Sequence, residues 1–132
     1  MNDAWWISTK DFLPNMEEKV LVISKFGRIS NQLYTNHGTP GKERFSPEGY
    51  KAGIDVKWWM PIPTDGWKEI KSEKPEPGQR VLTMGMYGMI TDAIYRKSKF
   101  SDEMEFSPFT GWKFLFWREM PELPKGVVLS AQ

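Results

Sequence analysis

The chain contains no cysteine, which excludes disulfide bonds, thiolate zinc sites and cysteine nucleophiles. Histidine is nearly absent as well, because His37 is the single one in 132 residues. His37 lies in a stretch rich in Gly, Pro and Asn with no nucleophile-elbow sequence nearby, so we expect an exposed loop residue rather than part of a Ser-His-Asp system. Only oxygen-ligand metal sites remain, and no spacing of Asp and Glu resembles a calcium loop. We therefore expect no metal, no cofactor and no catalytic residue.

Long apolar runs are also missing, and none approaches the roughly 18 residues that a membrane-spanning helix needs. The first residues lack the basic and apolar segments of a signal peptide. The net charge is only +1 and neither half of the chain is a basic arm, which disfavours general binding to duplex nucleic acid. We expect a soluble, cytoplasmic protein that has no membrane partner.

An internal repeat organises the sequence. Segment 6–34 aligns with segment 67–95 without a gap, and the matched positions are mostly Trp, Pro, Gly and apolar residues, whose structural roles are specific. We interpret the chain as a tandem duplication, with a first copy at 1–63 and a second copy at 64–132. The identical pairs are Trp6/Trp67, Lys10/Lys71, Pro14/Pro75, Val20/Val81, Leu21/Leu82, Gly27/Gly88, Ile29/Ile90 and Tyr34/Tyr95.

Each copy has the pattern of a three-stranded β-meander. In the first copy, Val20–Ser24 is β-branched and apolar without a helical period, and Ile29–Tyr34 returns after Gly27, which suits a tight hairpin. The third strand is Val56–Met60, which we expect Pro61 to end because proline cannot donate to the ladder. The corresponding strands of the second copy are Arg80–Met84, Met89–Tyr95 and Lys113–Trp117.

Polar residues and turn formers separate the second and third strands, so we predict loops at Thr35–Arg44 and Arg96–Glu105. A Ser-Pro pair can open a helix, which leaves a short helical turn near Ser46–Lys51 or Ser107–Trp112 as an open alternative. The predicted fold class is all-β and mostly antiparallel, or α+β if such a turn forms in each copy. Because so small a sheet is marginal alone, we expect the two β-meander modules to pack with pseudo-twofold symmetry around a shared core.

Several separated motifs of the first copy occur in a characteristic order. They are an opening W-I-x-x-x-D-x-L-P at Trp6–Pro14, the strand Val20–Val22, the turn at Gly27 and a closing Trp-Met-Pro-Ile-Pro at Trp59–Pro63. Together they resemble the domain of unknown function 551 family, small modules encoded largely by bacteriophages and prophages. The second copy resembles a diverged member, without the Ile and Leu of the opening motif. The resemblance implies a β-rich fold, a phage origin and a bacterial host cytoplasm, and it implies no activity.

Aromatic residues, which make up 14% of the chain, carry the strongest functional signal. Trp6 and Trp67 begin the two copies, and we expect them to be core residues. Trp58 and Trp59 are neighbours on a predicted strand, so their side chains point to opposite faces, and one is exposed unless both faces are covered. An exposed Trp beside Lys57 could stack on a base or contact a partner protein, and burial between the copies is the alternative. The candidate binding residues are Tyr34, Trp58, Trp59, Tyr95, Arg96, Trp117 and Arg118.

These residues favour two functions of different class. The first is a non-catalytic, phage-encoded accessory protein that binds a host or phage protein, of a host-takeover or anti-defence type. The second is a nucleotide or single-stranded nucleic-acid binding protein with duplicated aromatic and basic pockets, and an enzyme is the least favoured reading. Met84, Met86 and Met89 cluster at one predicted hairpin, where core packing and a partner surface are both open to them.

Overall fold

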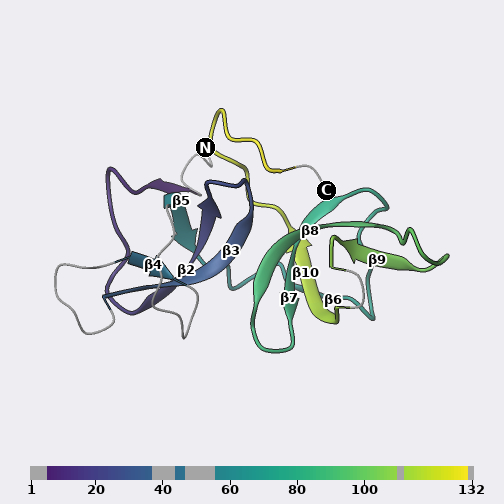
Figure 1. Ribbon diagram of the computed structural model, residues 1–132. Helices are drawn as coiled ribbons and strands as arrows, with labels where there is room; N and C mark the ends of the chain where they lie inside the picture. Colours follow the sequence, from purple (N-terminus) through teal and green to yellow (C-terminus); the bar gives the residue numbers. More distant parts are fainter. Residues whose placement is uncertain (1–5, 37–43, 47–55, 110–111, 131–132) are drawn as a thin grey trace. The chain divides into compact units, whose positions relative to one another are not determined.

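The computed structural model describes residues 6–36, 44–46, 56–109 and 112–130 (Figure 1). In this part of the chain there are β-strands, turns and loops but no helix, and the strands within each compact unit pair antiparallel. The predicted all-β, mostly antiparallel fold is confirmed. The chain divides into two units: unit 1 comprises Met1–Ile62 and Glu122–Ser130, and unit 2 comprises Pro63–Pro121 and Ala131–Gln132.

In unit 1 the described residues form strands β1 (Ile7–Ser8), β2 (Glu18–Ser24), β3 (Ile29–Thr35), β4 (Arg44–Ser46) and β5 (Val56–Pro61). Their spatial order is β1-β5-β2-β3-β4 (Figure 1). The two longest strands, β2 and β3, form the central hairpin, and β5 returns along the other edge of β2. The last strand, β5, therefore lies beside the first long strand, β2.

In unit 2 the described residues form strands β6 (Lys68–Glu69), β7 (Arg80–Gly85), β8 (Ile90–Lys97), β9 (Met104–Ser107) and β10 (Phe114–Glu119). Their spatial order is β6-β10-β7-β8-β9 (Figure 1). Each strand takes the place in unit 2 that its counterpart takes in unit 1. The two units therefore share one strand order, although each is assembled from its own segment of sequence.

The core of unit 1 lies on one face of its sheet. Strand alternation sends every second residue of β2 to that face, where the ring of Trp59 covers them. Tyr34 and Phe45 pack as a tilted pair with ring centroids 5.0 Å apart. The buried cluster is Val20, Val22, Tyr34, Phe45 and Trp59.

The core of unit 2 is built in the same way. Tyr95 and Phe106 are a tilted pair with centroids 5.1 Å apart, and the ring of Phe114 meets Phe106 edge-on at 5.7 Å. Phe114 occupies the position that Val56 holds in unit 1, so this core contains one more ring. The buried cluster is Val81, Ala93, Tyr95, Phe106, Phe114 and Trp117.

The hydrogen bonds that tie loops to strands are also repeated. Trp59 Nε1 donates to the carbonyl of Phe12 at 2.9 Å, and Trp117 Nε1 donates to the carbonyl of Glu73 at 2.8 Å. The side chains of Phe12 and Glu73 differ in chemistry, but the backbone carbonyl of each accepts the matched indole hydrogen bond. The indole nitrogens of Trp59 and Trp117 are therefore both paired, as most buried polar groups are.

The opposite faces of β2 and β7 are buried too, and here the units differ. Leu21 and Leu82 are both fully buried. Beside Leu82, the fully buried Asp92 accepts a hydrogen bond from Arg80 Nη1 at 2.5 Å. The corresponding position of β3, opposite Leu21, holds the half-buried Asn31. Unit 2 therefore contains a buried ion pair where unit 1 has an amide.

Three details of the sequence prediction need correction. The short strands β4 and β9 begin inside or beside segments predicted as loops, and Phe45 lies opposite Tyr34 in the ladder. Pro61 belongs to β5, opposite Val20, instead of following its end. The predicted boundaries at 1–63 and 64–132 leave the end of the chain in the second copy, whereas Glu122–Ser130 packs with unit 1.

Of the predicted helical turn at Ser107–Trp112, residues 107–109 and 112 are described, and none of these lies in a helix. The amide of Phe109 donates to the carbonyl of Phe106 at 2.8 Å and that of Trp112 to Phe109 at 3.1 Å, which are turn contacts. The other predicted position, Ser46–Lys51, lies outside the described residues apart from Ser46, and so does His37. The pseudo-twofold packing of the copies stays a prediction.

Candidate functional site

One end of each sheet carries the hairpin turn between its first two long strands. Gly27 in unit 1 has φ +76° and Gly88 in unit 2 has φ +79°, a left-handed conformation that favours glycine. The amide of Gly27 donates to the carbonyl of Ser24 at 3.0 Å, and that of Gly88 to Gly85 at 3.1 Å. The two turns therefore have the same backbone, and their differences lie in the residues around it.

A β-bulge in the last strand lies at the same end. In unit 1, Ile23 is opposite Trp58 and the next residue of β2 is opposite Val56, so Lys57 is the extra residue. In unit 2 the register shifts between Phe114 and Phe116, and Leu115 is the extra residue. A bulge re-aims the side chain of the added residue. It presents a lysine in unit 1 and a leucine in unit 2.

The segment Glu122–Ser130, called the tail below, lies against the turn of unit 1. The amide of Ser130 donates to the carbonyl of Gly27 at 2.9 Å. A Cβ on Gly27 would lie 2.8 Å from the Ser130 nitrogen, closer than a Cβ can approach without displacing it. A Cβ on Gly88 would meet nothing within 4 Å. Gly27 thus serves both the turn and the tail, whereas Gly88 serves the turn.

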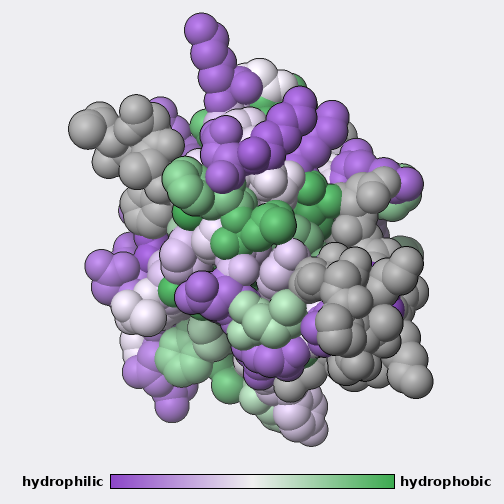
Figure 2. Space-filling model, turned by 90° about the vertical axis from the view of Figure 1, so that its left-hand side faces the viewer, coloured by the Kyte–Doolittle hydropathy of each residue, from purple (hydrophilic) through white to green (hydrophobic). Residues whose placement is uncertain are grey.

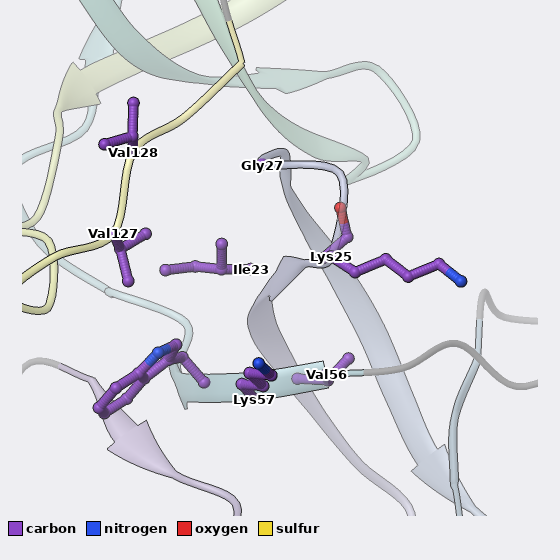
Figure 3. Close-up of a pocket in the computed structure, with 9 residues that line it drawn as sticks. Ile23, Lys25, Gly27, Val56, Lys57, Val127 and Val128 are labelled. Carbon is purple, nitrogen blue, oxygen red and sulfur yellow. The ribbon is translucent and has the colours of Figure 1, made fainter.

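A pocket of about 570 Å³ lies between the tail and this end of unit 1 (Figure 3). The strands contribute Ile23, Val56 and Trp58 to its wall, and the tail contributes Val127 and Val128. Figure 3 shows the side chains of Ile23 and Val127 pointing toward one another across this space. The volume is in the range of small-molecule sites, roughly 300–1,000 Å³.

Two lysines, Lys25 and Lys57, also line the pocket, and the described lining residues include no carboxylate. Lys25 Nζ lies 5.3 Å from the centroid of the Phe26 ring, within cation–π distance, and Figure 3 shows its side chain extended away from Val127. Figure 2, which views the side that carries unit 1 in Figure 1, shows apolar side chains gathered together and bordered by polar ones. The pocket is therefore apolar with a cationic edge.

The equivalent end of unit 2 is apolar and exposed. Met86 and Tyr87, at the tip of the β7–β8 hairpin, are 57% and 94% exposed. Leu115 at the bulge is 45% exposed, and Trp112, just before β10, is 54% exposed. Gly85 lies opposite Phe114 in the ladder, which brings the hairpin tip and the start of β10 to the same end of the sheet. We call Met86, Tyr87, Trp112 and Leu115 the apolar end of unit 2.

Most of the predicted aromatic candidates are core residues. Trp59 and Trp117 are 6% and 3% exposed, and Tyr34 and Tyr95 are buried in the same two clusters. Their ring faces are in contact with other side chains, so they are not open to a stacking base. Trp59 is buried within the core of its own unit, and the predicted alternative of burial between the copies stays a prediction.

The other three candidates lie apart from these cores. Trp58 points to the face opposite Trp59, as predicted, and lines the pocket. Arg118 is buried, and its Nη1 donates to the backbone carbonyl of Asp65 while its Nε donates to Glu119 at 3.1 Å. Arg96 is half-buried on β8, opposite Glu105 of β9. Of the seven candidates, Trp58 is the one placed at the unit 1 pocket.

Sequence reasoning missed Lys25 and the tail residues that complete this pocket. Lys25 corresponds to Met86 in the predicted repeat. The replacement of an apolar residue by a lysine at matched turns could have indicated from the sequence that the two turns differ in function. The part of the tail after Pro124 has no counterpart in the predicted repeat, so nothing in the sequence assigned it to unit 1. In the described residues, no group of three or more His, Asp or Glu side chains is placed to hold a metal ion.

Comparisons with protein-family models, with curated proteins and with solved structures find no significant match. The resemblance to the domain of unknown function 551 family therefore stays a prediction. Across the described residues, none lies in a helix of the length and apolar character needed to cross a membrane.

Proposed function

We propose that this chain is a non-catalytic, phage-encoded accessory protein whose unit 2 binds a host or phage protein. The observation that carries the proposal is the apolar end of unit 2, where four large side chains are exposed within one region of the sheet. Grouped exposed apolar side chains are typical of interaction surfaces, and Tyr, Trp and Met are enriched at protein interfaces. The phage origin depends on the family resemblance.

The apolar end combines adaptable and rigid parts. Met86 has an unbranched side chain that can adjust to the shape of a partner. Trp112 is held in place by rings, with centroids 5.2 Å from Phe109 and 6.3 Å from Phe114. A partly fixed aromatic side chain loses less conformational entropy when it is buried in an interface. These features suit a surface that contacts an apolar groove on another protein.

Tandem duplication is part of the proposal. The shared strand order, the matched ring pairs and the matched Trp hydrogen bonds support descent of both units from one module. In this view one copy kept lysines at its open end and the other acquired apolar residues there. Because Lys25 and Lys57 stand in unit 1 where Met86 and Leu115 stand in unit 2, lysine is the natural substitution with which to test the surface of unit 2.

The test uses the double variant Met86→Lys/Leu115→Lys, which gives unit 2 the residues that unit 1 carries at matched positions. Proteins retained from a phage-infected bacterial lysate by the wild-type chain are identified, and the candidate partner is purified. Its Kd is then measured by calorimetry. We expect the variant to bind at least about tenfold more weakly, because two interface side chains would be replaced by strongly hydrated charges.

The matched control is Lys25→Gln/Lys57→Gln, which alters the same positions of unit 1. It should leave the Kd of the partner unchanged. Equal binding by wild type and the Met86→Lys/Leu115→Lys variant, with both folded by circular dichroism, would contradict the assignment of the surface.

Binding of nucleotides or single strands is a second candidate, favoured by Trp58 beside two lysines in the unit 1 pocket. Calorimetry with AMP and with oligo-dT, each at low and high salt, tests it. A single-strand site should lose affinity steeply as salt rises, because bound phosphates release counterions. Absence of heat with both ligands at low salt would remove this candidate.

A further inference from the structure

We infer that the pocket between the tail and unit 1 is a binding site for a small, flat, mainly apolar monoanion, such as an aromatic carboxylate. This site goes beyond the proposed function, because it lies in unit 1 and the proposed protein surface lies in unit 2. The inference depends on three observations: the shape of the pocket, the sign of the charges at its edge and the way in which the tail is held.

The shape favours one small molecule over an extended chain. Ile23 and Val56 on the strand side and Val127 and Val128 on the tail side enclose the space, and Trp58 adds an aromatic wall. Apolar atoms dominate this lining, so the hydrophobic effect would favour burial of an aromatic ring there. A flat aromatic body therefore has surfaces to contact on both sides.

The charges favour an anion. Lys25 and Lys57 both contribute to the lining, and the described lining residues contain no Asp or Glu that would neutralise them. Lys57 is exposed and sits on the β-bulge, which turns its side chain out of the regular strand alternation. Lys25 has to leave the Phe26 ring to reach a ligand. We therefore expect Lys57 to contribute more than Lys25.

The tail makes the pocket specific to unit 1. Gly27 has no side chain, and the Ser130 amide uses the free space to reach its carbonyl at 2.9 Å. This contact holds the tail, whose Val127 and Val128 form one wall of the pocket. Unit 2 has Met86 and Leu115 in place of the two lysines. The matched turn and bulge positions of unit 2 therefore provide an internal comparison for the two lysines.

The experiment measures binding of 1-naphthoate and of its neutral isostere 1-naphthamide to the ¹⁵N-labelled full chain. Calorimetry gives the affinities, and amide chemical shifts give the location. We expect 1-naphthoate to bind with a Kd of about 1 mM or tighter, as is reasonable for a ligand of this size. Shifts should concentrate at Lys57, Trp58 and Val127, and 1-naphthamide should bind at least about fivefold more weakly.

Matched variants test each part. Lys57→Gln should weaken 1-naphthoate about fivefold and leave 1-naphthamide unchanged, whereas Lys113→Gln, a lysine of unit 2, should change neither. Gly27→Ala should weaken both ligands because it displaces the tail, and Gly88→Ala should weaken neither. The Gly88→Ala variant carries the same backbone strain, so it separates loss of the tail from loss of stability.

The inference is overturned if neither naphthalene ligand binds, if the two bind equally, or if the shifts fall in unit 2. It is also overturned if AMP binds more tightly than 1-naphthoate at the same residues, which would favour the nucleotide candidate. None of these results bears on the protein surface of unit 2, which is tested separately by the Met86→Lys/Leu115→Lys variant.

Discussion

Unit 1 and unit 2 are nearly interchangeable at their cores and unlike at their open ends. In the cores a Trp of the last strand packs beside a Tyr–Phe pair and donates its indole N–H to a backbone carbonyl. At the open ends, unit 1 presents two lysines and a covering tail, and unit 2 presents Met86, Tyr87 and Leu115. Core positions are constrained by packing, so the differences between the two units are concentrated at surface positions.

The largest effect should come from the matched tryptophans. Trp59→Ala and Trp117→Ala should each lower the free energy of unfolding by about 3–5 kcal/mol, because each removes a buried ring and leaves a cavity. Urea unfolding followed by far-ultraviolet circular dichroism measures both losses. A large loss in one variant with almost none in the other would show that the two cores are not equivalent.

The ion pair between the buried Asp92 and the half-buried Arg80 of unit 2 should give the next largest effect. Asp92→Ala should cost about 3 kcal/mol of stability, because Arg80 would lose its buried partner. At the matched position of unit 1, Asn31→Ala should cost below about 1 kcal/mol, since its amide is half-buried and uncharged. The double variant Arg80→Lys/Asp92→Asn, which installs the unit 1 residues, should recover part of the loss. Failure to recover any of it would mean that the pairs are not exchangeable.

Substitution of the two turn glycines should give smaller losses of stability, and the two losses should differ. Gly88→Ala should cost about 1–2 kcal/mol, from the positive φ alone. Gly27→Ala should cost more, because its Cβ also collides with the Ser130 nitrogen. Hydrogen exchange of the Ser130 amide should accelerate in Gly27→Ala and stay unchanged in Gly88→Ala. Equal exchange in both variants would mean that the turn does not hold the tail.

The smallest effect concerns Glu17 and Gly78, which hold matched positions before the central hairpins. Their amides donate to Tyr34 at 2.7 Å and Tyr95 at 2.6 Å, and both have positive φ, 67° and 87°. Glu17→Gly should relieve backbone strain and lose the hydrogen bond with Thr35, for a net change below about 1 kcal/mol. Gly78→Ala should lower the free energy of unfolding by about 1 kcal/mol, because alanine disfavours a positive φ. Thermal unfolding compares them, and a stability gain from Gly78→Ala would contradict the comparison.

The longer strands could be predicted because their residues identify them directly. Val20–Ser24 is rich in β-branched residues, Gly27 marks the hairpin and Val56–Met60 is a mostly apolar run followed by proline, so these elements agree with the structure to within two residues. The strands β4 and β9 are too short for a periodic signal, and they form because Phe45 and Phe106 pack against a tyrosine. Tertiary contacts of that kind are not visible in a local pattern.

The candidate site was harder to predict than the fold. Alternation correctly placed Trp58 and Trp59 on opposite faces, but the sequence could not tell which of the two would be buried. Aromatic residues suit cores and binding surfaces equally well, and the difference depends on what covers them. The contact between the tail and Gly27 depends on the missing side chain of Gly27 and on the backbone amide of Ser130. No periodic sequence pattern predicts a contact of this kind.

The return of the tail to unit 1 has a consequence for synthesis. The strands of unit 1 leave the ribosome first, and Val127 and Val128, which complete its pocket, leave after all the strands of unit 2. During translation the first sheet can form its ladder, but its pocket still lacks one wall. A ligand of that pocket would therefore bind only after the tail has been synthesised.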